Sequence, residues 1–325
     1  MPQVDVSRIE DISRAALVAH GAPSDAAAVM AGAVAWAEAR GNRICGLYYL
    51  ESYCQQLRSG RVDGGAEPIV THRRPASLHV DGADGFAQTA FLAGLPAAVR
   101  AAREYGTATI AVGRCHTCTA LGWFTEGAAR EGLVALGTTN ASPIVAPPGG
   151  TGRVIGTNPV AFAVPDGAGG IAMAFDQATT QVALGAVTMA KAAGEPIPEG
   201  WAFDADGRPT TDPDAALRGS LASAGGAKGW GIGLMAEILT VGLGGGRASA
   251  DVRPLKAPEG APHDLGMAFM LIDPTVAPDF AERVRALAEA VEAAGGRMPG
   301  RDRVTARSVE VPEGLWQTVE RLAEG

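Results

Sequence analysis

The chain has 325 residues, with 27 basic and 35 acidic side chains, which gives a net charge of −8. This acidic balance argues against nucleic acid as the main partner, and no apolar run reaches the roughly 20 residues that a membrane span needs. The four cysteines and the charged N-terminus lead us to expect reduced thiols, a cytoplasmic location and no membrane contact.

Helices are expected at both ends of the chain. Residues 7–10 read Ser-Arg-Ile-Glu, a capping box that satisfies free N–H groups where a helix begins. The apolar periodicity predicts helices over residues 7–20, 25–39, 45–58, 278–295 and 313–323. In the third of these helices Cys45, Tyr49 and Tyr53 recur every four residues, so a continuous helix would place them on one face.

The middle of the chain predicts a sheet. Short β-like runs cover residues 77–80, 109–112, 133–136, 160–164 and 267–272, and helical stretches cover residues 89–105, 123–130 and 229–242. Residues 194–215 predict a loop, and residues 244–264 predict a flexible loop or lid. We therefore predict an α/β protein with a central domain of residues 76–277. The helices of residues 1–75 and 278–325 would pack together as a second domain.

Two short motifs leave alternatives open. Cys115-His116-Thr117-Cys118 fits a metal site, redox chemistry, or two buried thiols beside a histidine; without a second Cys/His pair we expect no metal. Gly225-Gly226-Ala227-Lys228-Gly229 precedes an apolar helix, so it fits either a phosphate or carboxylate cradle or a plain connector. No Gly-x-Gly-x-x-Gly sequence links a strand to a helix, which argues against a Rossmann fold.

Polar side chains follow several of the predicted strands. Asn140 and Asn158 lie in turns after strand-like runs, and Asp176 lies at the end of another. Each of these side chains either caps the local backbone or serves as a functional group.

The chain carries an ordered series of motifs: Thr139-Asn140-Ala141-Ser142-Pro143, Ala146-Pro147-Pro148-Gly149-Gly150, Ile155-Gly156-Thr157-Asn158-Pro159, Asp176-Gln177-Ala178-Thr179-Thr180, Ile197-Pro198-Glu199-Gly200-Trp201 and Gly225-Gly226-Ala227-Lys228-Gly229. Over nearly its whole length the chain thereby resembles the malate/L-lactate dehydrogenase-like family of NAD(P)-dependent oxidoreductases. That family includes ureidoglycolate dehydrogenase, diketogulonate reductase and piperideine/pyrroline-2-carboxylate reductase.

The resemblance implies a non-Rossmann domain with a large mixed β-sheet that binds NAD or NADP, a second domain made from both chain ends, and a homodimer. It places the active site at the boundary between the domains, near the partner chain. The cofactor-binding residues that it implies are Asp176, Gln177, Ala178, Thr179, Thr180, Gln181, Lys228, Gly229, Gly300, Arg301, Asp302, Asn140 and Pro148.

The chain departs from the family where the substrate is expected. The family has Ser-His-Gly with an arginine four residues after the histidine, whereas this chain has Ile44, Cys45 and Gly46, with Tyr49 at the arginine position. A second family histidine falls on Thr117, one residue after His116.

The candidate catalytic residues are therefore Asp176, His116, Cys45, Tyr49 and Thr117, and the candidate substrate-binding residues are Arg43, Tyr48, Arg114 and Asn158. We expect hydride transfer between the nicotinamide and a small carbonyl or cyclic imine compound, of the 2-oxo/2-hydroxy acid or imino acid class. The alternatives are a cofactor-binding homodimer that has lost dehydrogenase activity and a Cys/His metal protein.

Overall fold

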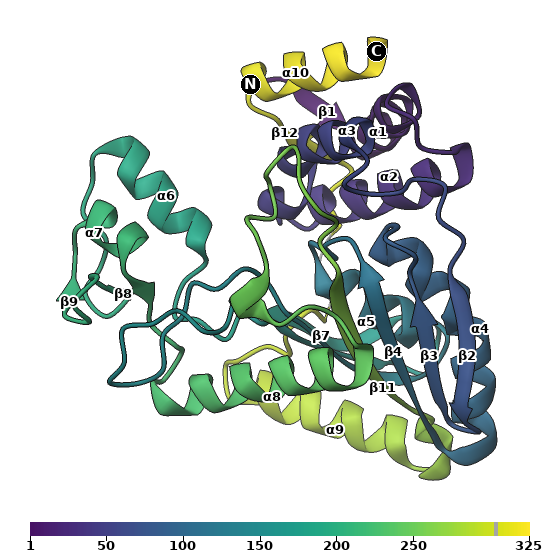
Figure 1. Cartoon of the computed structure of the whole chain (residues 1–325). Coiled ribbons are helices and arrows are strands. Elements are labelled where there is room, and N and C mark those ends of the chain that lie inside the picture. Colours follow the sequence, from purple (N-terminus) through teal and green to yellow (C-terminus); the bar gives the residue numbers. More distant parts are fainter. Residues whose placement is uncertain (302–304) are drawn as a thin grey trace.

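A computed structural model describes residues 1–301 and 305–325 and has a seven-stranded sheet at its centre (Figure 1). The strands are ordered β2-β3-β4-β11-β5-β6-β7. Their bounds are Ile69–Arg74 (β2), Ser77–Asp81 (β3), Thr107–Cys115 (β4), Val134–Thr139 (β5), Val160–Pro165 (β6), Ile171–Gln177 (β7) and Leu265–Ile272 (β11). In this sheet β3 and β4 run parallel, and the other neighbours are antiparallel. The predicted large mixed sheet is confirmed, and its pairing differs from the all-parallel order of a Rossmann domain.

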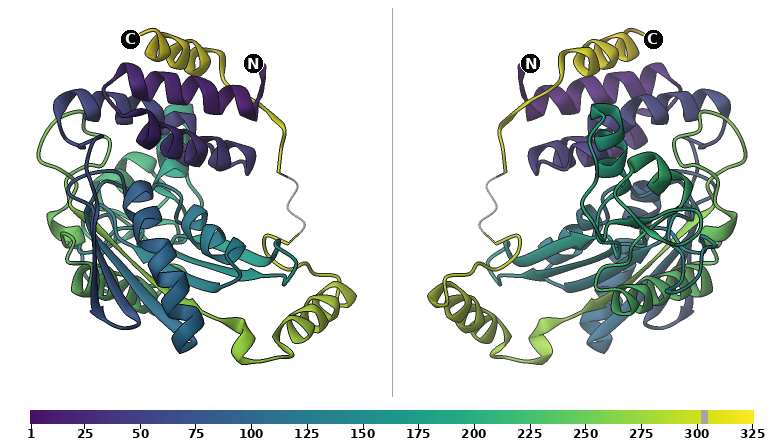
Figure 2. Two further views of the ribbon diagram at one scale, coloured as in Figure 1. Left: turned by 90° about the vertical axis from the view of Figure 1, so that its right-hand side faces the viewer. Right: turned by 90° about the vertical axis from the view of Figure 1, so that its left-hand side faces the viewer.

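Helices cover both faces of this sheet. Helices α4 (Ala87–Tyr105) and α5 (Leu121–Arg130) pack on one face, and α8 (Ala227–Gly244) packs on the other (Figures 1 and 2). Phe91, Phe124 and Phe269 meet under α4 and α5, with the ring centroids of Phe91 and Phe269 4.8 Å apart. Burying these large apolar side chains fixes the two helices on the sheet.

The two chain ends build the second domain, as expected. Strand β1 (Gln3–Asp5) pairs with β12 (Ser308–Glu310), and both termini lie in this domain, near opposite ends of the last helix (Figure 1). The helices of this domain are α1 (Val6–Ala19), α2 (Ser24–Ala39), α3 (Leu50–Ser59) and α10 (Glu313–Glu324). Their shared core includes the fully buried Ile9, Leu17 and Met30.

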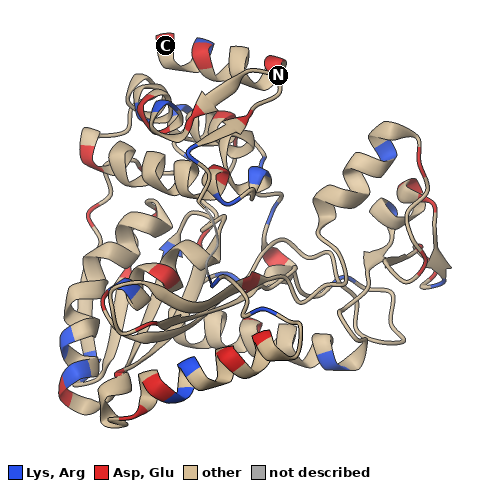
Figure 3. Cartoon of the chain, turned by 180° about the vertical axis from the view of Figure 1, so that it is seen from behind, with Lys and Arg blue, Asp and Glu red and all other residues tan. Residues whose placement is uncertain are grey.

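Helix α9 (Phe280–Ala293) departs from the expected arrangement. It lies at the far end of the sheet, after the short 3₁₀ turn η4 (Pro274–Val276) and away from the terminal helices (Figure 2). Acidic and basic residues are interspersed along it (Figure 3), and Ala288 is the one buried residue of this helix. Its less exposed residues Ala281, Val284, Ala288 and Val291 share one face, but Figure 2 shows the helix on the side of the sheet away from the terminal helices. We therefore propose that their domain resumes after α9, near residue 305, instead of at residue 278.

A small lobe replaces the loop predicted over residues 194–215. It contains α6 (Leu184–Ala193), β8 (Ala202–Phe203), β9 (Pro209–Thr210), α7 (Pro213–Arg218) and β10 (Ser220–Leu221). Val187, Ile197 and Leu221 are buried in its core. Its strands have two residues each, too few for an alternating pattern to show in the sequence.

The predicted helix over residues 45–58 is wrong in its first turn. Two 3₁₀ turns, η1 (Arg43–Cys45) and η2 (Leu47–Tyr49), precede α3. The buried Glu38 side chain causes this break, because its Oε1 accepts a hydrogen bond of 2.8 Å from the Leu47 N–H. Only a glycine fits at position 46, since a Cβ there would lie 2.2 Å from the same oxygen.

None of the helices in the described ranges is long and apolar enough to cross a membrane.

Candidate active site

Asp176 lies at the end of β7, where the sheet meets the terminal helices. Its Oδ2 accepts a hydrogen bond of 2.8 Å from the Gly122 N–H at the start of α5. Trp36 of α2 and Asp176 both border Gly122, with the Trp36 ring 3.3 Å and the Asp176 Cβ 3.1 Å from the place of a Cβ. Desolvation raises the pKa of the Asp176 carboxyl to about 6, and the amides of Gly122 and Leu121 oppose that rise. Asp176 therefore titrates close to neutral pH.

Two other predicted catalytic residues lie in the 3₁₀ turns: Cys45, which is within electrostatic range of this carboxylate, and Tyr49, which is within range of Cys45. Desolvation and then the charge of Asp176 raise the pKa of the half-buried Cys45 thiol to about 12. Desolvation likewise raises the pKa of Tyr49 above its usual range. Both groups are therefore neutral near pH 7, and neither is tuned as an acid or base for that pH.

His116 and Thr117 lie deeper in the protein. The Nε2–H of His116 donates to Gln56 Oε1 at 2.6 Å, and its ring stacks on that of His263 with 4.1 Å between centroids. Desolvation and the neighbouring His263 hold the pKa of His116 well below its usual value. The Thr117 N–H donates to His263 Nδ1 at 3.2 Å. Both side chains are buried, and the His116 ring packs beside the ring of Tyr53.

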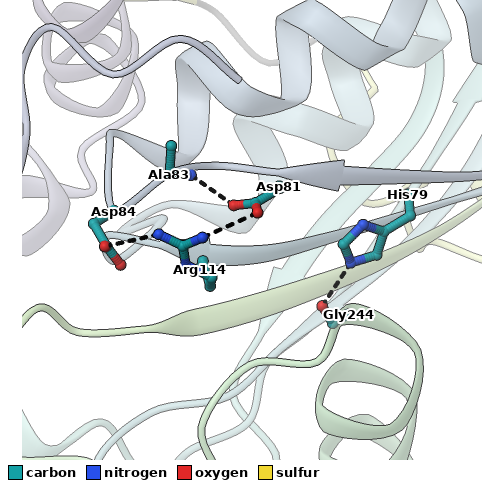
Figure 4. A network of polar contacts seen from close by, with 6 residues as sticks. All are labelled: His79, Asp81, Ala83, Asp84, Arg114 and Gly244. Carbon is teal, nitrogen blue, oxygen red and sulfur yellow. Dashed lines mark hydrogen bonds and ion pairs between the residues drawn. The ribbon is translucent and has the colours of Figure 1, made fainter. Parts of the chain in front are cut away.

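The predicted substrate-binding residues are scattered. Arg114 is exposed and forms ion pairs of 3.1 Å with both Asp81 and Asp84 (Figure 4). In the same view a ring nitrogen of His79 lies 3.0 Å from the Gly244 carbonyl oxygen, which ties β3 to the end of α8. Arg114 thus stabilises the turn after β3.

Asn158 is fully buried and links its turn to α8. Its amide nitrogen donates to Glu237 Oε2 at 2.7 Å and to the Gly233 carbonyl at 3.1 Å. Arg43 is exposed; desolvation raises the pKa of the nearby Glu38, and the Leu47 amide and then the charge of Arg43 oppose that rise. Tyr48 is exposed and precedes Tyr49 in the sequence. Of these four residues, Arg43 and Tyr48 belong to the same pair of turns as Cys45.

The segment 176–181 connects two glycine-containing turns. Thr179 donates from its N–H to the Thr157 carbonyl at 2.9 Å, and Gln181 donates to the Ala222 carbonyl at 2.8 Å. Thr180 forms a β-bridge with Ser223, while Gln177 and Gln181 are exposed. Ala178 is half-buried and Thr179 and Thr180 are buried, so the segment leads from the exposed Asp176 through a buried stretch toward the turn before α8.

The turn before α8 has the geometry of an anion cradle. Gly225 and Gly226 have φ angles of +63° and +64°, and a Cβ on Gly229 would lie 2.2 Å from the Ala224 carbonyl oxygen. Lys228 is exposed in the first turn of this 18-residue helix, where unpaired N–H groups favour a negative charge. This turn therefore fits the phosphates of a dinucleotide cofactor.

The remaining predicted cofactor residues lie in separate segments of the chain. Gly300 approaches β7 so closely that a Cβ would lie 2.5 Å from the Ala174 oxygen, and Arg301 Nη1 is 3.3 Å from Glu292 Oε1. Asn140 is buried and donates to the Arg247 carbonyl at 2.8 Å, and Pro148 is exposed. Asp302 lies outside the described residues. The cofactor assignments stay predictions.

The Cys115–Cys118 motif is dispersed by the fold. Cys115 Sγ donates to the Leu265 carbonyl at 3.2 Å, whereas His116 turns toward Gln56. Among the described residues no group of three or more His, Cys, Asp or Glu side chains could hold a metal ion.

Sequence reasoning missed two contributors to this site. Glu38 shapes the turns that carry Cys45 and Tyr49. The one feature of the sequence that could have indicated this role is Gly46, which leaves room for the Glu38 side chain. Lys256 was missed altogether, since nothing around it in the sequence suggests a function. Its Nζ donates to the Tyr48 carbonyl at 2.9 Å and lies 3.3 Å from the centroid of the Tyr48 ring.

Known proteins share this architecture. A (2R)-3-sulfolactate dehydrogenase (NADP(+)) of Chromohalobacter salexigens is 40% identical over 96% of this chain and 95% of its own length. A Delta(1)-pyrroline-2-carboxylate/Delta(1)-piperideine-2-carboxylate reductase of Pseudomonas putida is 37% identical over 98% of this chain and 95% of its own. The crystal structure of the delta1-piperideine-2-carboxylate reductase of Pseudomonas syringae has a TM-score of 0.90 at 32% identity, and the match covers 99% of this chain and 100% of that one.

The family model for malate/L-lactate dehydrogenase matches residues 4–316. The chain belongs to the malate/L-lactate dehydrogenase family, and it is an NAD(P)-dependent oxidoreductase that transfers a hydride to or from a small substrate.

Proposed function

We propose that this enzyme reduces a small cyclic imine that carries a carboxylate, of the pyrroline- or piperideine-2-carboxylate type. The observation that carries the proposal is Asp176, an acid with a pKa of about 6 that accepts the Gly122 N–H and lies near Cys45, while Cys45 and Tyr49 stay neutral. When bound, the cofactor supplies the hydride. The chain's own residues must orient the substrate and manage one proton.

The proton requirement favours an imine over a ketone. A ketone needs a proton delivered to its oxygen, but near pH 7 Asp176 is mostly ionised, and Cys45 and Tyr49 are weak acids. An iminium ion already carries its proton on nitrogen. The ionised Asp176 carboxylate would stabilise that cation by accepting the N–H hydrogen bond. Asp176 then forms an ion pair with the positive iminium group of the substrate.

The relatives support this assignment and favour a second candidate. Several proteins 34–38% identical to this chain are named as pyrroline-2-carboxylate reductases. The 40% identical relative is named as a sulfolactate dehydrogenase, so oxidation of a sulfonated 2-hydroxy acid is the alternative substrate class. In that direction the ionised Asp176 would accept the hydroxyl proton as a general base.

Steady-state assays with purified protein distinguish these functions. NADH and NADPH would each be tested with Δ1-pyrroline-2-carboxylate and Δ1-piperideine-2-carboxylate, and NAD⁺ and NADP⁺ with 3-sulfolactate, malate and lactate. Turnover of the imines alone would support the proposal, and turnover of sulfolactate alone would favour the second candidate. A third outcome would indicate a site that has lost its activity. In that case the wild type would bind the cofactor tightly without turnover, and lactate or malate oxidation would appear only when Cys45→His and Tyr49→Arg are combined.

We also propose that the enzyme is a cytoplasmic homodimer. All four cysteines are free, which fits a reducing compartment. Ile232, Met235 and Leu243 are exposed along α8, and Met270 is exposed on the neighbouring β11. An apolar cavity of about 70 Å³ lies between α8 and the sheet beside them. This surface suits a second copy, and light scattering should give twice the monomer mass of 33.0 kDa.

A further inference from the structure

The segment that carries Lys256, residues 252–263 and called the strap below, crosses from the end of α8 to the terminal helices. It is pinned through its backbone. Gln56 Nε2 donates to the carbonyls of Leu255 at 2.8 Å and Ala257 at 2.7 Å, and Ser59 Oγ donates to the Pro258 carbonyl at 2.7 Å. The position of Lys256 is therefore fixed by bonds on both sides of it.

Arg61 adds the strongest of these anchors. Its side chain is 2% exposed, and its guanidinium donates to the carbonyls of Pro254, Ala257 and Ala261. Within the described ranges it makes no ion pair with a carboxylate. Because the guanidinium of this buried arginine donates its hydrogen bonds to strap carbonyls, it holds this segment against the terminal helices.

The strap places the Lys256 ammonium among aromatic rings instead of acids. Its Nζ lies 3.3 Å from the ring centroid of Tyr48 and 4.6 Å from that of Tyr49. In residues 1–301 and 305–325 no carboxylate lies within 4.0 Å of it. The ionisable groups that face it are Glu51 of α3 and the Cys45 thiol, besides the two tyrosines. Desolvation lowers its pKa to about 8.

The other two lysines have different surroundings. Lys191 forms a 2.6 Å ion pair with Asp214 on the small lobe, and Lys228 is exposed at the start of α8. Lys256 uses one hydrogen bond, to the Tyr48 carbonyl, so two of its three N–H donors remain for a ligand.

We propose that Lys256 binds the carboxylate of the substrate and that the rings of Tyr48 and Tyr49 position its ammonium for this role. The inference rests on the proposed function. The one predicted catalytic group that is charged near pH 7 is Asp176, an anion that repels a carboxylate. Arg114 forms ion pairs with Asp81 and Asp84, and the charge of the exposed Arg43 acts on Glu38.

A protonated cyclic imino acid carries a positive iminium nitrogen and a negative carboxylate close together. Asp176 and Lys256 have the charges that complement these two groups. Asp176 would face the iminium nitrogen, and Lys256 would face the carboxylate. The charges of both Asp176 and Lys256 act on the Cys45 thiol, so both groups lie within electrostatic range of that side chain. The strap therefore selects substrates that carry an anion beside the reducible bond.

The first test compares Lys256→Met and Lys256→Arg with Lys191→Met as the matched control. Loss of a charged hydrogen bond should raise KM for the imino acid about 10- to 100-fold in Lys256→Met, with a smaller change in kcat. Lys256→Arg should recover part of that loss, and Lys191→Met should behave as wild type. Tyr48→Leu should raise KM more than Tyr48→Phe, which keeps the ring. An unchanged KM in Lys256→Met, with wild-type turnover intact, would overturn the inference and leave the proposed function standing.

The second test needs no turnover and no variant. Because its pKa is about 8, Lys256 should react with acetic anhydride at pH 8 faster than Lys191, as measured by peptide mass spectrometry. Pyrrole-2-carboxylate, a stable planar probe, should protect Lys256 in the cofactor-loaded protein, and pyrrole-2-carboxamide should not. If both compounds protect Lys256 equally, or if neither compound protects it, Lys256 does not recognise the carboxylate. If wild type turns over no imino acid, the proposed function fails, and this protection measurement still decides whether Lys256 binds the carboxylate.

Discussion

Replacing Asp176 by asparagine removes the charge at the centre of the site and keeps the side-chain shape. The amide oxygen of the new residue can still accept the 2.8 Å hydrogen bond from the Gly122 N–H, so the fold should persist. If Asp176 stabilises the iminium ion, kcat should fall by about 100-fold or more, as for other groups aimed at a charged reacting centre.

The pH profile gives this prediction its magnitude. With a pKa of about 6, wild-type Asp176 is about ten parts ionised to one protonated at pH 7, and the ratio is reversed at pH 5. Wild-type kcat/KM for imine reduction should therefore fall about 10-fold from pH 7 to pH 5. Asp176→Asn should lose this limb. Asp214→Asn is the matched control, because Asp214 is an exposed acid that pairs with Lys191 on the small lobe.

Stability should respond in the opposite direction to activity. The folded-state pKa of Asp176 is raised from 3.8, so the folded protein loses stability as pH rises from about 4 through 6 and the carboxyl ionises. At pH 7 Asp176→Asn should therefore have a Tm equal to or above that of wild type. A variant that keeps the acid limb near pH 6, or loses less than about threefold in kcat/KM, would refute the assigned role of Asp176.

Three further substitutions test the architecture around the site. Gly46→Ala should lower stability by about 1–3 kcal/mol in urea unfolding, because its Cβ displaces the buried Glu38 from its hydrogen bond. Gly229→Ala should raise the Kd for NADPH about 10-fold or more in fluorescence titrations with little loss of fold, because its Cβ would collide with the Ala224 backbone and move the cradle. Gln56→Met removes the side-chain donor to the Leu255 carbonyl and leaves the Ala257 carbonyl to Arg61 alone, so limited proteolysis should cut the strap faster than in wild type; an unchanged rate would show that the Gln56 anchor is unnecessary.

Much of the fold could be predicted from local patterns. Alternating apolar runs identified most of the central strands, and apolar periodicity identified the helices of both chain ends. The ordered motifs then identified the family, which supplied the mixed sheet and the cofactor. These features depend on residues close together in the sequence, and each pattern is read within a short window.

The site was harder to predict because its contacts are long-range. The break before α3 depends on Glu38, which reaches the Leu47 N–H from the preceding helix. Lys256 meets the Tyr48 carbonyl across 208 positions of sequence. Asn158 looked like a turn residue facing a ligand, yet its amide is buried against Glu237. No window of local sequence contains both partners of these contacts.

The buried histidines help to assign the pH dependence of the site. His263 belongs to the strap, and desolvation lowers its pKa to about 3, while His116 beneath it is likewise held neutral. Their rings stack at 4.1 Å beside the cationic Arg61, so protonating either histidine would place like charges together in a dry interior. The strap therefore stays docked well below pH 6, and Lys256 keeps its charge there. Loss of activity between pH 7 and pH 5 then comes from the substrate itself or from a carboxyl group whose pKa desolvation raises, which among the described residues are Asp176, Glu38 and Asp264. The Asp176→Asn profile isolates the part that is due to Asp176.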